Sequence, residues 1–200
     1  MGELGTIFGG LTGKSKDDFL DGNARFISYV NIFNNIAARL DSDDFVHVDP
    51  GERQRSLKRG DILFTGSSET AEEVGMSSVV TREVDEPLYL NSFSIGYRLN
   101  ESEVLDPEFT KHLFRSEGMR KQLVKTASGV TRFNVSKARL AKVEVPIPVL
   151  EEQRRIASVL DKFDALVNDL SIGLPAELNA RRKQYEYYRD RLLTFEEAPV

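Results

Sequence analysis

The chain has 200 residues, 40% hydrophobic and 30% charged, which is the composition of a folded protein of one or two domains. It has no cysteine, which excludes disulfides and thiolate chemistry. Its two histidines, His47 and His112, lie far apart in the sequence, so we predict no metal site. The net charge is −5, and we expect neither a membrane span nor a signal peptide, because the apolar runs are short and the N-terminus lacks a basic start.

Residues 1–150 are rich in glycine, serine and short runs of β-branched and aromatic residues, which predicts a β-rich half. The run 61–65 follows the turn signal Arg59-Gly60. Pro146 and Pro148 are expected to end the last strand, because proline donates no hydrogen bond to a ladder. The predicted strands are residues 25–32, 61–65, 78–81, 88–99 and 143–147.

A helical region is predicted after Asp106, which is a good N-cap, and Pro107, which suits the first helical position. Gly118 is expected to break or bend this helix. The same region opens a basic segment, because residues 111–142 contain nine Lys or Arg against one acidic residue, a local charge of +8. This asymmetry favours a surface that faces a polyanion, and a solvated helix face is the alternative.

After Pro148 the apolar residues follow steps of three and four, which predicts two helices with heptad seams. We expect an extended coiled coil with a partner helix, either the other segment or a second copy, and the alternative is packing on the β-rich half. Gly173 and Pro175 between the helices are compatible with a kink or a hairpin. The seam positions expected to contact a partner are Ile156, Val159, Phe163, Leu166, Leu170, Leu178, Tyr185, Tyr188 and Leu192.

No catalytic constellation is found in the sequence, so we predict that the chain is not an enzyme. Gly13-Lys14-Ser15 lacks the first glycine of a phosphate-binding loop, since Phe8 occupies that position. The segment 66–70 lacks the second glycine of a hydrolase nucleophile turn and a histidine in the required chain order. The acidic pairs, such as Glu151-Glu152, are typical of loops and helix starts.

Five segments of the chain resemble the specificity subunit of Type I restriction–modification systems. They are residues 57–64, 129–136, 145–148, 152–157 and 174–193, which include Val-Pro-Ile-Pro, Glu-Gln-Arg-Arg-Ile-Ala and Arg-Lys-Gln-Tyr-Glu-Tyr-Tyr-Arg. The resemblance implies an α+β fold, with a β-rich target recognition domain over residues 1–150. A helical spacer would follow over residues 151–195, with a tail at 196–200.

The resemblance also implies a function, namely non-catalytic recognition of a bipartite site on double-stranded DNA. The chain would direct methyltransferase subunits, which hold S-adenosylmethionine, and a restriction subunit to this DNA site. The complex would act in the cytoplasm. Relatives usually carry two recognition domains and this sequence has one, so it is either a half-size subunit or a fragment. Pairing through the helices predicts a homodimer with two recognition domains. The alternative is a coiled-coil adaptor between proteins, without sequence-specific DNA binding.

The candidate DNA-binding residues fall into two classes. Cations of the basic segment are expected to contact phosphates, and polar residues of loops and of the strand end at Tyr29 and Asn31 to recognise base edges. The phosphate candidates are Arg120, Lys121 and Lys125. The base-edge candidates are Lys14, Ser15, Lys16, Tyr29, Asn31, Ser67, Ser68, Thr70, Thr131, Arg132 and Asn134.

Overall fold

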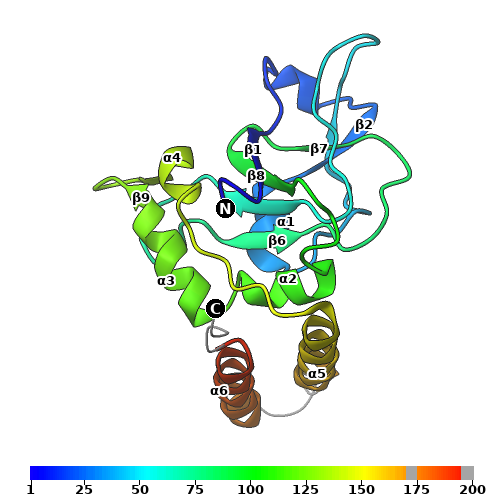
Figure 1. Ribbon diagram of the computed structural model, residues 1–200. Helices are drawn as coiled ribbons and strands as arrows, with labels where there is room; N and C mark the ends of the chain where they lie inside the picture. The colour runs from blue at the N-terminus through cyan, green and yellow to red at the C-terminus, as the bar shows by residue number, and fades with distance from the viewer. Residues whose placement is uncertain (170–174, 195–200) are drawn as a thin grey trace.

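The computed structural model describes residues 1–169 and 175–194. At its centre lies a four-stranded antiparallel sheet with the strand order β1-β8-β4-β6 (Figure 1). All four residues of β4 are buried, as expected for a continuous apolar run covered on both faces. In the register, Ile62 lies opposite both Val79 and Tyr97. The strands are β1 (Gly5–Gly9), β4 (Ile62–Thr65), β6 (Ser77–Val79) and β8 (Ser94–Leu99).

Two three-stranded sheets flank the central one. One has the order β3-β2-β7, in which β2 and β7 are parallel and β2 and β3 antiparallel, and it lies near the short 3-10 helix η1 (Asp17–Phe19). The other, with the order β5-β10-β9, is antiparallel throughout. Their strands are β2 (Ala24–Ile27), β3 (Phe45–Val46), β7 (Leu88–Leu90), β5 (Ser67–Ser68), β9 (Ala127–Ser128) and β10 (Phe133–Val135).

Three predicted strands need correction. The strand predicted over residues 25–32 ends at Ile27, and helix α1 (Tyr29–Asn34) follows, because the Ser28 hydroxyl caps it by accepting a hydrogen bond from the backbone N–H of Asn31 at 3.4 Å. The strand predicted over residues 88–99 is two strands, β7 and β8, separated by a turn. Residues 143–147 form no strand, which fits the two prolines that interrupt them.

The helical region after Asp106 is confirmed, but its break comes earlier than predicted. Helix α2 (Pro107–Leu113) is capped by the Asp106 carboxylate, which accepts from the N–H of Glu108 at 2.9 Å. Helix α3 (Glu117–Thr126) starts at Ser116, whose hydroxyl is its N-cap, so Gly118 lies inside its first turn. A short helix α4 (Lys137–Leu140) follows β10.

The buried side chains form two clusters on opposite faces of the central sheet. Ile62 and Phe64 point into the first, with residues of α2, α3, α5 and β8, whereas Leu63 belongs to the second, with Phe8 and Ile32. The alternation follows from the two-residue period of a strand. Both the helices and the sheets therefore build the core, and the fold is α+β, as predicted.

Two long helices, α5 (Leu150–Asp169) and α6 (Pro175–Leu192), lie side by side and antiparallel (Figure 1). Phe163 and Tyr188 stack across them with ring centroids 5.8 Å apart. Of the two arrangements left open by Gly173 and Pro175, the described helices show the hairpin rather than a kink between collinear segments.

The apolar heptad positions of α5 are partly covered by the β-rich half of the same chain. This is the arrangement predicted as the alternative to an extended coiled coil. Ile156 and Leu160 are fully buried in the first cluster, and Tyr185 and Leu192 of α6 pack against it. Leu166 remains 52% exposed. Leu170 and the side chain of Leu178 lie outside the described residues.

Within residues 1–169 and 175–194, no helix is long and apolar enough to cross a membrane.

Candidate nucleic-acid interface

The sheet β5-β10-β9 brings together two predicted segments that lie far apart in the sequence. Asn134 of β10 is paired with Ser67 of β5 on one side and with Ser128 of β9 on the other. Phe133 is paired with Ser68. The predicted base-edge residues of segments 67–70 and 131–134 therefore form one surface.

Arg132 is the cation of this surface, and its guanidinium is oriented by Ser67. Its Nε and Nη2 donate to Ser67 Oγ at 3.3 and 3.1 Å, while the Arg132 side chain stays exposed. Nη1 has no hydrogen-bond partner in the described part of the chain. A guanidinium fixed at one edge retains donors for an external acceptor, such as the O6 and N7 of a guanine.

The hairpin between β9 and β10 projects from the body of the molecule (Figure 1). Gly129 has φ +147°, and a Cβ there would lie 1.9 Å from the carbonyl oxygen of Arg132, so only glycine fits. Val130 is 91% exposed, and Thr131 and Asn134 are exposed as well. The hairpin therefore presents its side chains to solvent.

A hollow of about 480 Å³ lies beside Arg132. Tyr29 and Phe33 of α1 line it with parallel rings whose centroids are 6.0 Å apart. The remaining lining residues are Ser67, Ser68, Glu69, Glu73, Phe93 and Arg132. Tyr29, Ser67, Ser68 and Arg132 were predicted as base-edge residues, and the tertiary structure gathers them from three parts of the sequence.

Glu73 organises the β5 end of this hollow. Its carboxylate accepts hydrogen bonds from the Thr70 hydroxyl at 2.9 Å and from the Ser68 hydroxyl at 3.5 Å. Sequence reasoning missed Phe33, Glu69, Glu73 and Phe93, because no local pattern distinguishes them from ordinary turn and helix residues.

Arg120 was predicted to contact phosphate, and the structure gives it a different role. Its Nη1 donates to the carbonyl oxygen of Gly75 at 2.6 Å, and its Nη2 donates to those of Glu72 and Val74 at 2.7 and 2.8 Å. Burial lowers the pKa of Arg120. The guanidinium anchors the turn before β6, so it is not available to a phosphate.

Other cations of the basic segment are also engaged inside the chain. Arg115 donates to the carbonyl oxygens of Ser77 at 2.6 Å and Ile32 at 2.8 Å, and burial lowers its pKa to about 10. Lys121, a predicted phosphate contact, is exposed but forms an ion pair with Glu117. The charge of +8 therefore overstates the charge available to an external anion.

Exposed cations of this segment remain next to the β9–β10 hairpin. Lys125, a predicted phosphate contact, is exposed near the end of α3, and Lys137 is exposed at the start of α4. Arg139 is exposed and donates to the carbonyl oxygen of Ala127 in β9 at 3.2 Å. Lys137 and Arg139 belong to the basic segment, whose cations were predicted to contact phosphates, although they were not named among its leading candidates.

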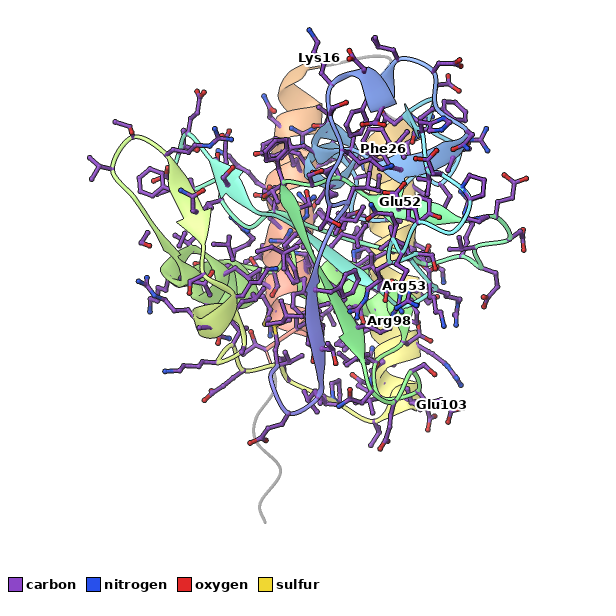
Figure 2. The ribbon with its side chains drawn as sticks, turned by 90° about the horizontal axis from the view of Figure 1, so that it is seen from above. Lys16, Phe26, Glu52, Arg53, Arg98 and Glu103 are labelled. Atoms are coloured by element: carbon purple, nitrogen blue, oxygen red, sulfur yellow. The ribbon has the colours of Figure 1, made fainter. Side chains whose placement is uncertain are left out.

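The predicted loop 14–16 lies elsewhere on the molecule. The side chain of Lys14 is 4% exposed and forms an ion pair with Glu52, which lowers the pKa of that carboxyl to about 2. Ser15 donates to Asp18 from both its backbone N–H and its hydroxyl. Figure 2 places Lys16 on a different side from the β9–β10 hairpin, so this loop is not part of the surface around Arg132.

Asn31 is buried rather than exposed at a strand end. Its Nδ2 donates to the carbonyl oxygen of Arg39 at 2.8 Å, and its Oδ1 accepts from the N–H of Arg39 at 3.0 Å. These bonds use the donor and acceptor that adenine recognition would need. In this structure Asn31 is therefore a buried residue that holds the segment at Arg39, which does not favour the prediction that it recognises a base.

A second basic segment was not identified from the sequence, although its run of basic residues is visible there. Residues 53–59 contain four basic residues and no acidic one. Figure 2 shows Arg53 on the same side as Glu52 and Arg98. The guanidinium groups of Arg55 and Arg98 lie over the ring of Phe8, 4.9 and 5.4 Å from its centroid.

The helices α5 and α6 are fixed on α2 by a polar cluster around the buried side chain of His112. His112 Nε2 lies 2.7 Å from Asp161 Oδ1 of α5, and His112 Nδ1 lies 3.0 Å from the Tyr185 hydroxyl of α6. Lys111 adds an ion pair with Asp161 at 2.8 Å. Burial raises the pKa of Tyr185, so its hydroxyl stays protonated and neutral.

The outer part of the helix pair remains open. Leu166 is 52% exposed, Tyr187 59% and Tyr188 38%, whereas Val159 and Phe163 are half-buried. The predicted partner residues thus divide into inner ones, which pack on the chain itself, and outer ones, which face solvent.

Residues 1–180 match the family model described as the Type I restriction modification DNA specificity domain. The chain is 38% identical over 88 residues to the specificity subunit of the type I restriction enzyme EcoR124I/EcoR124II of Escherichia coli, which covers 44% of this chain and 22% of that protein. It is 33% identical over 138 residues to the putative type I restriction enzyme specificity subunit S.HindORF215P of Haemophilus influenzae, with 69% and 33% covered. The alignments therefore span a third or less of these two relatives.

Solved structures support the fold. A Type-I restriction-modification system S subunit from M. genitalium aligns with a TM-score of 0.52 at 15% identity, over 84% of this chain and 39% of that chain. The HsdS subunit from Thermoanaerobacter tengcongensis aligns with a TM-score of 0.53 at 18% identity, over 96% and 42%. Each alignment uses less than half of the solved chain.

Proposed function

Because the chain belongs to the family of Type I restriction modification DNA specificity domains, we propose that it selects the DNA sequence on which a Type I restriction–modification complex acts. The observation that carries the proposal is the surface around Arg132, where the β9–β10 hairpin and the hollow join segments from three parts of the sequence. The proposed role is recognition without catalysis.

Recognition would divide between base edges and phosphates. Arg132 suits a forked pair of hydrogen bonds to guanine. Asn134 suits adenine, because among the described residues its Nδ2 gives only one hydrogen bond, to the Arg132 carbonyl oxygen at 3.3 Å, and its exposed amide keeps a second N–H. Each such pair is worth about 1–3 kcal/mol of discrimination. Lys125, Lys137 and Arg139 flank the hairpin and suit phosphate contacts that set the register on the duplex.

The chemistry would belong to other subunits. We propose that methyltransferase subunits, which hold S-adenosylmethionine, and a restriction subunit assemble with this chain in the cytoplasm. The support is that the curated relatives named above are themselves specificity subunits of type I restriction enzymes. This chain would recognise the target DNA sequence and bind no cofactor of its own.

A homodimer through α5 and α6 would supply a second recognition domain. Leu166 of α5 and Tyr187 and Tyr188 of α6 are exposed on the helix pair, and a coiled-coil contact with a second copy would cover such side chains. The solved relatives are more than twice as long as the part aligned here, which leaves room for a second domain in their chains. The twofold axis of such a dimer would impose a symmetric, interrupted DNA site.

DNA recognition is tested with Arg132→Ala and, as a matched control, Arg82→Ala, which removes an exposed arginine on an acidic part of the surface. Methylated positions are mapped in DNA exposed to each variant with its methyltransferase. We expect Arg132→Ala to relax the preference at one base pair and Arg82→Ala to preserve the pattern. An unchanged pattern in Arg132→Ala refutes the assignment of the hairpin. Failure of the wild-type chain to bind DNA at low salt, with methyltransferase present, favours the protein adaptor.

Self-association is tested with Leu166→Asp, which places a charge on the exposed edge of α5. Sedimentation velocity should show a loss of dimer, whereas Leu20→Asp, at a site 77% exposed in the recognition half, should leave the dimer intact. A wild-type chain that sediments as a monomer at high concentration contradicts the homodimer and leaves DNA recognition open to its own test.

A further inference from the structure

Phe93 is an exposed aromatic ring on a turn that is held rigidly. The side chain is 74% exposed, yet its backbone N–H donates to Asn91 Oδ1 at 3.0 Å. The Ser94 hydroxyl donates to the same oxygen at 3.0 Å, and Asn91 Nδ2 donates to the buried carbonyl oxygen of Ile27 at 2.9 Å. Single exposed apolar residues are common in folded proteins, and this one is carried by a hydrogen-bonded turn beside the hollow.

The same turn is locked to the strand that orients Arg132. The N–H of Gly66 donates to the carbonyl oxygen of Phe93 at 3.1 Å, and a Cβ at Gly66 would lie 2.2 Å from that oxygen. Gly66 is followed directly by Ser67, whose hydroxyl accepts from the Arg132 guanidinium. The backbone at Phe93 is therefore coupled through one glycine to the strand that orients Arg132.

The surroundings of the ring suit base edges better than phosphates. Phe93 lines the hollow together with Arg132 and the carboxylate-bearing Glu69 and Glu73. Carboxylates repel phosphates but accept hydrogen bonds from the amino groups that cytosine presents in the major groove. In that groove the apolar group available to a phenyl ring is the 5-methyl group of thymine.

We propose that Phe93 is a specificity-determining residue that recognises a thymine in the target site through its 5-methyl group. This inference rests on the proposed function, since it takes double-stranded DNA as the ligand of the surface around Arg132. The hydrogen-bonded turn fixes the backbone of Phe93 before binding, so little backbone freedom is lost on contact.

The experiment uses the full chain, reconstituted with its methyltransferase, and a pool of random duplexes from which bound sequences are selected. Each thymine of the selected site is then replaced by deoxyuridine, which removes only the 5-methyl group. We expect one replacement to weaken binding of the wild type by about fourfold, the effect of one buried methyl-sized group. Phe93→Ala should bind the thymine and deoxyuridine duplexes equally, and Leu20→Ala, at another exposed apolar side chain, should behave as the wild type.

The outcomes separate this inference from the proposed function. A wild-type chain that binds a specific site without responding to any deoxyuridine replacement overturns the role of Phe93 and leaves DNA recognition intact. A Phe93→Ala variant that still responds overturns it too. A Phe93→Ala variant that weakens binding and reduces DNA bending equally on both duplexes identifies the ring as a wedge between base steps, which also contradicts the methyl contact. Absence of any sequence preference in the wild type refutes both proposals together.

Discussion

Replacing Arg120 by methionine is expected to destabilise the fold rather than to weaken DNA binding directly. The guanidinium donates three hydrogen bonds, at 2.6–2.8 Å, to the carbonyl oxygens of Glu72, Val74 and Gly75. Hydrogen bonds that involve a charged group are worth about 1.5–3 kcal/mol each, and water would satisfy part of the carbonyl oxygens at this half-buried site. We therefore expect a loss of about 3 kcal/mol in the free energy of unfolding.

The assay is urea unfolding followed by circular dichroism, with Lys125→Met as the matched control. Lys125 ends the same helix but is exposed and has no hydrogen-bond or ion-pair partner in the described part of the chain. Its replacement should leave stability unchanged, while the slope of log affinity for DNA against log salt falls by about 0.9, the value for one phosphate contact.

Arg120→Met should leave that slope unchanged under conditions in which the variant is folded. A structural role for Arg120 is refuted if Arg120→Met unfolds at the same urea concentration as the wild type and its slope of log affinity against log salt falls by about 0.9. That result would mean that Arg120 contacts a phosphate, as predicted from the sequence.

Three further predictions concern other contacts. Lys14→Met should raise the pKa of Glu52 from about 2 toward 4.5 in a carboxyl NMR titration, because the ion pair is the largest cause of the shift, and an unchanged pKa would contradict the pairing. Burial raises the pKa of Asp161, but hydrogen bonds from the histidine and lysine side chains of α2 outweigh it and lower the pKa below 3.8. The ionised Asp161 carboxylate therefore stabilises the fold above about pH 3.8, and this stabilisation is lost as the pH falls. Asp161→Asn should make the free energy of unfolding fall less steeply at acid pH, and an equally steep fall in the variant would contradict this. Gly66→Ala should cost about 1–3 kcal/mol in calorimetric stability because its Cβ would lie 2.2 Å from a carbonyl oxygen of the β7–β8 turn. Gly118→Ala is the control, since nothing lies within 4 Å of a Cβ there, and equal losses in both variants would refute the steric argument.

Much of the fold could be predicted because its signals are local. The run Ile62-Leu63-Phe64-Thr65, within the predicted strand 61–65, is a central strand, and Asp106 and Pro107 start α2 as their types indicate. The strand predicted through residue 32 failed because Ser28 can cap a helix, and that capping bond competes with the β-propensity of its neighbours.

The candidate site could be predicted only in part. Ser67, Ser68 and Arg132 were identified one by one as polar loop residues, but their meeting depends on the pairing of β5 with β10. Phe93 and Glu73 carry no local signal, since their roles come from the hollow they line.

The sequence by itself determined where the charges and the apolar seams lie along the chain, and the family resemblance of its motifs. Only the tertiary structure decided which of them are available to a partner. The guanidinium of Arg120 is hydrogen-bonded to carbonyl groups about 45 residues away in sequence, and Ile156 is buried by residues of the β-rich half. A charge count and a heptad pattern are properties of one segment, whereas availability depends on which distant backbone and side-chain groups the fold places against it.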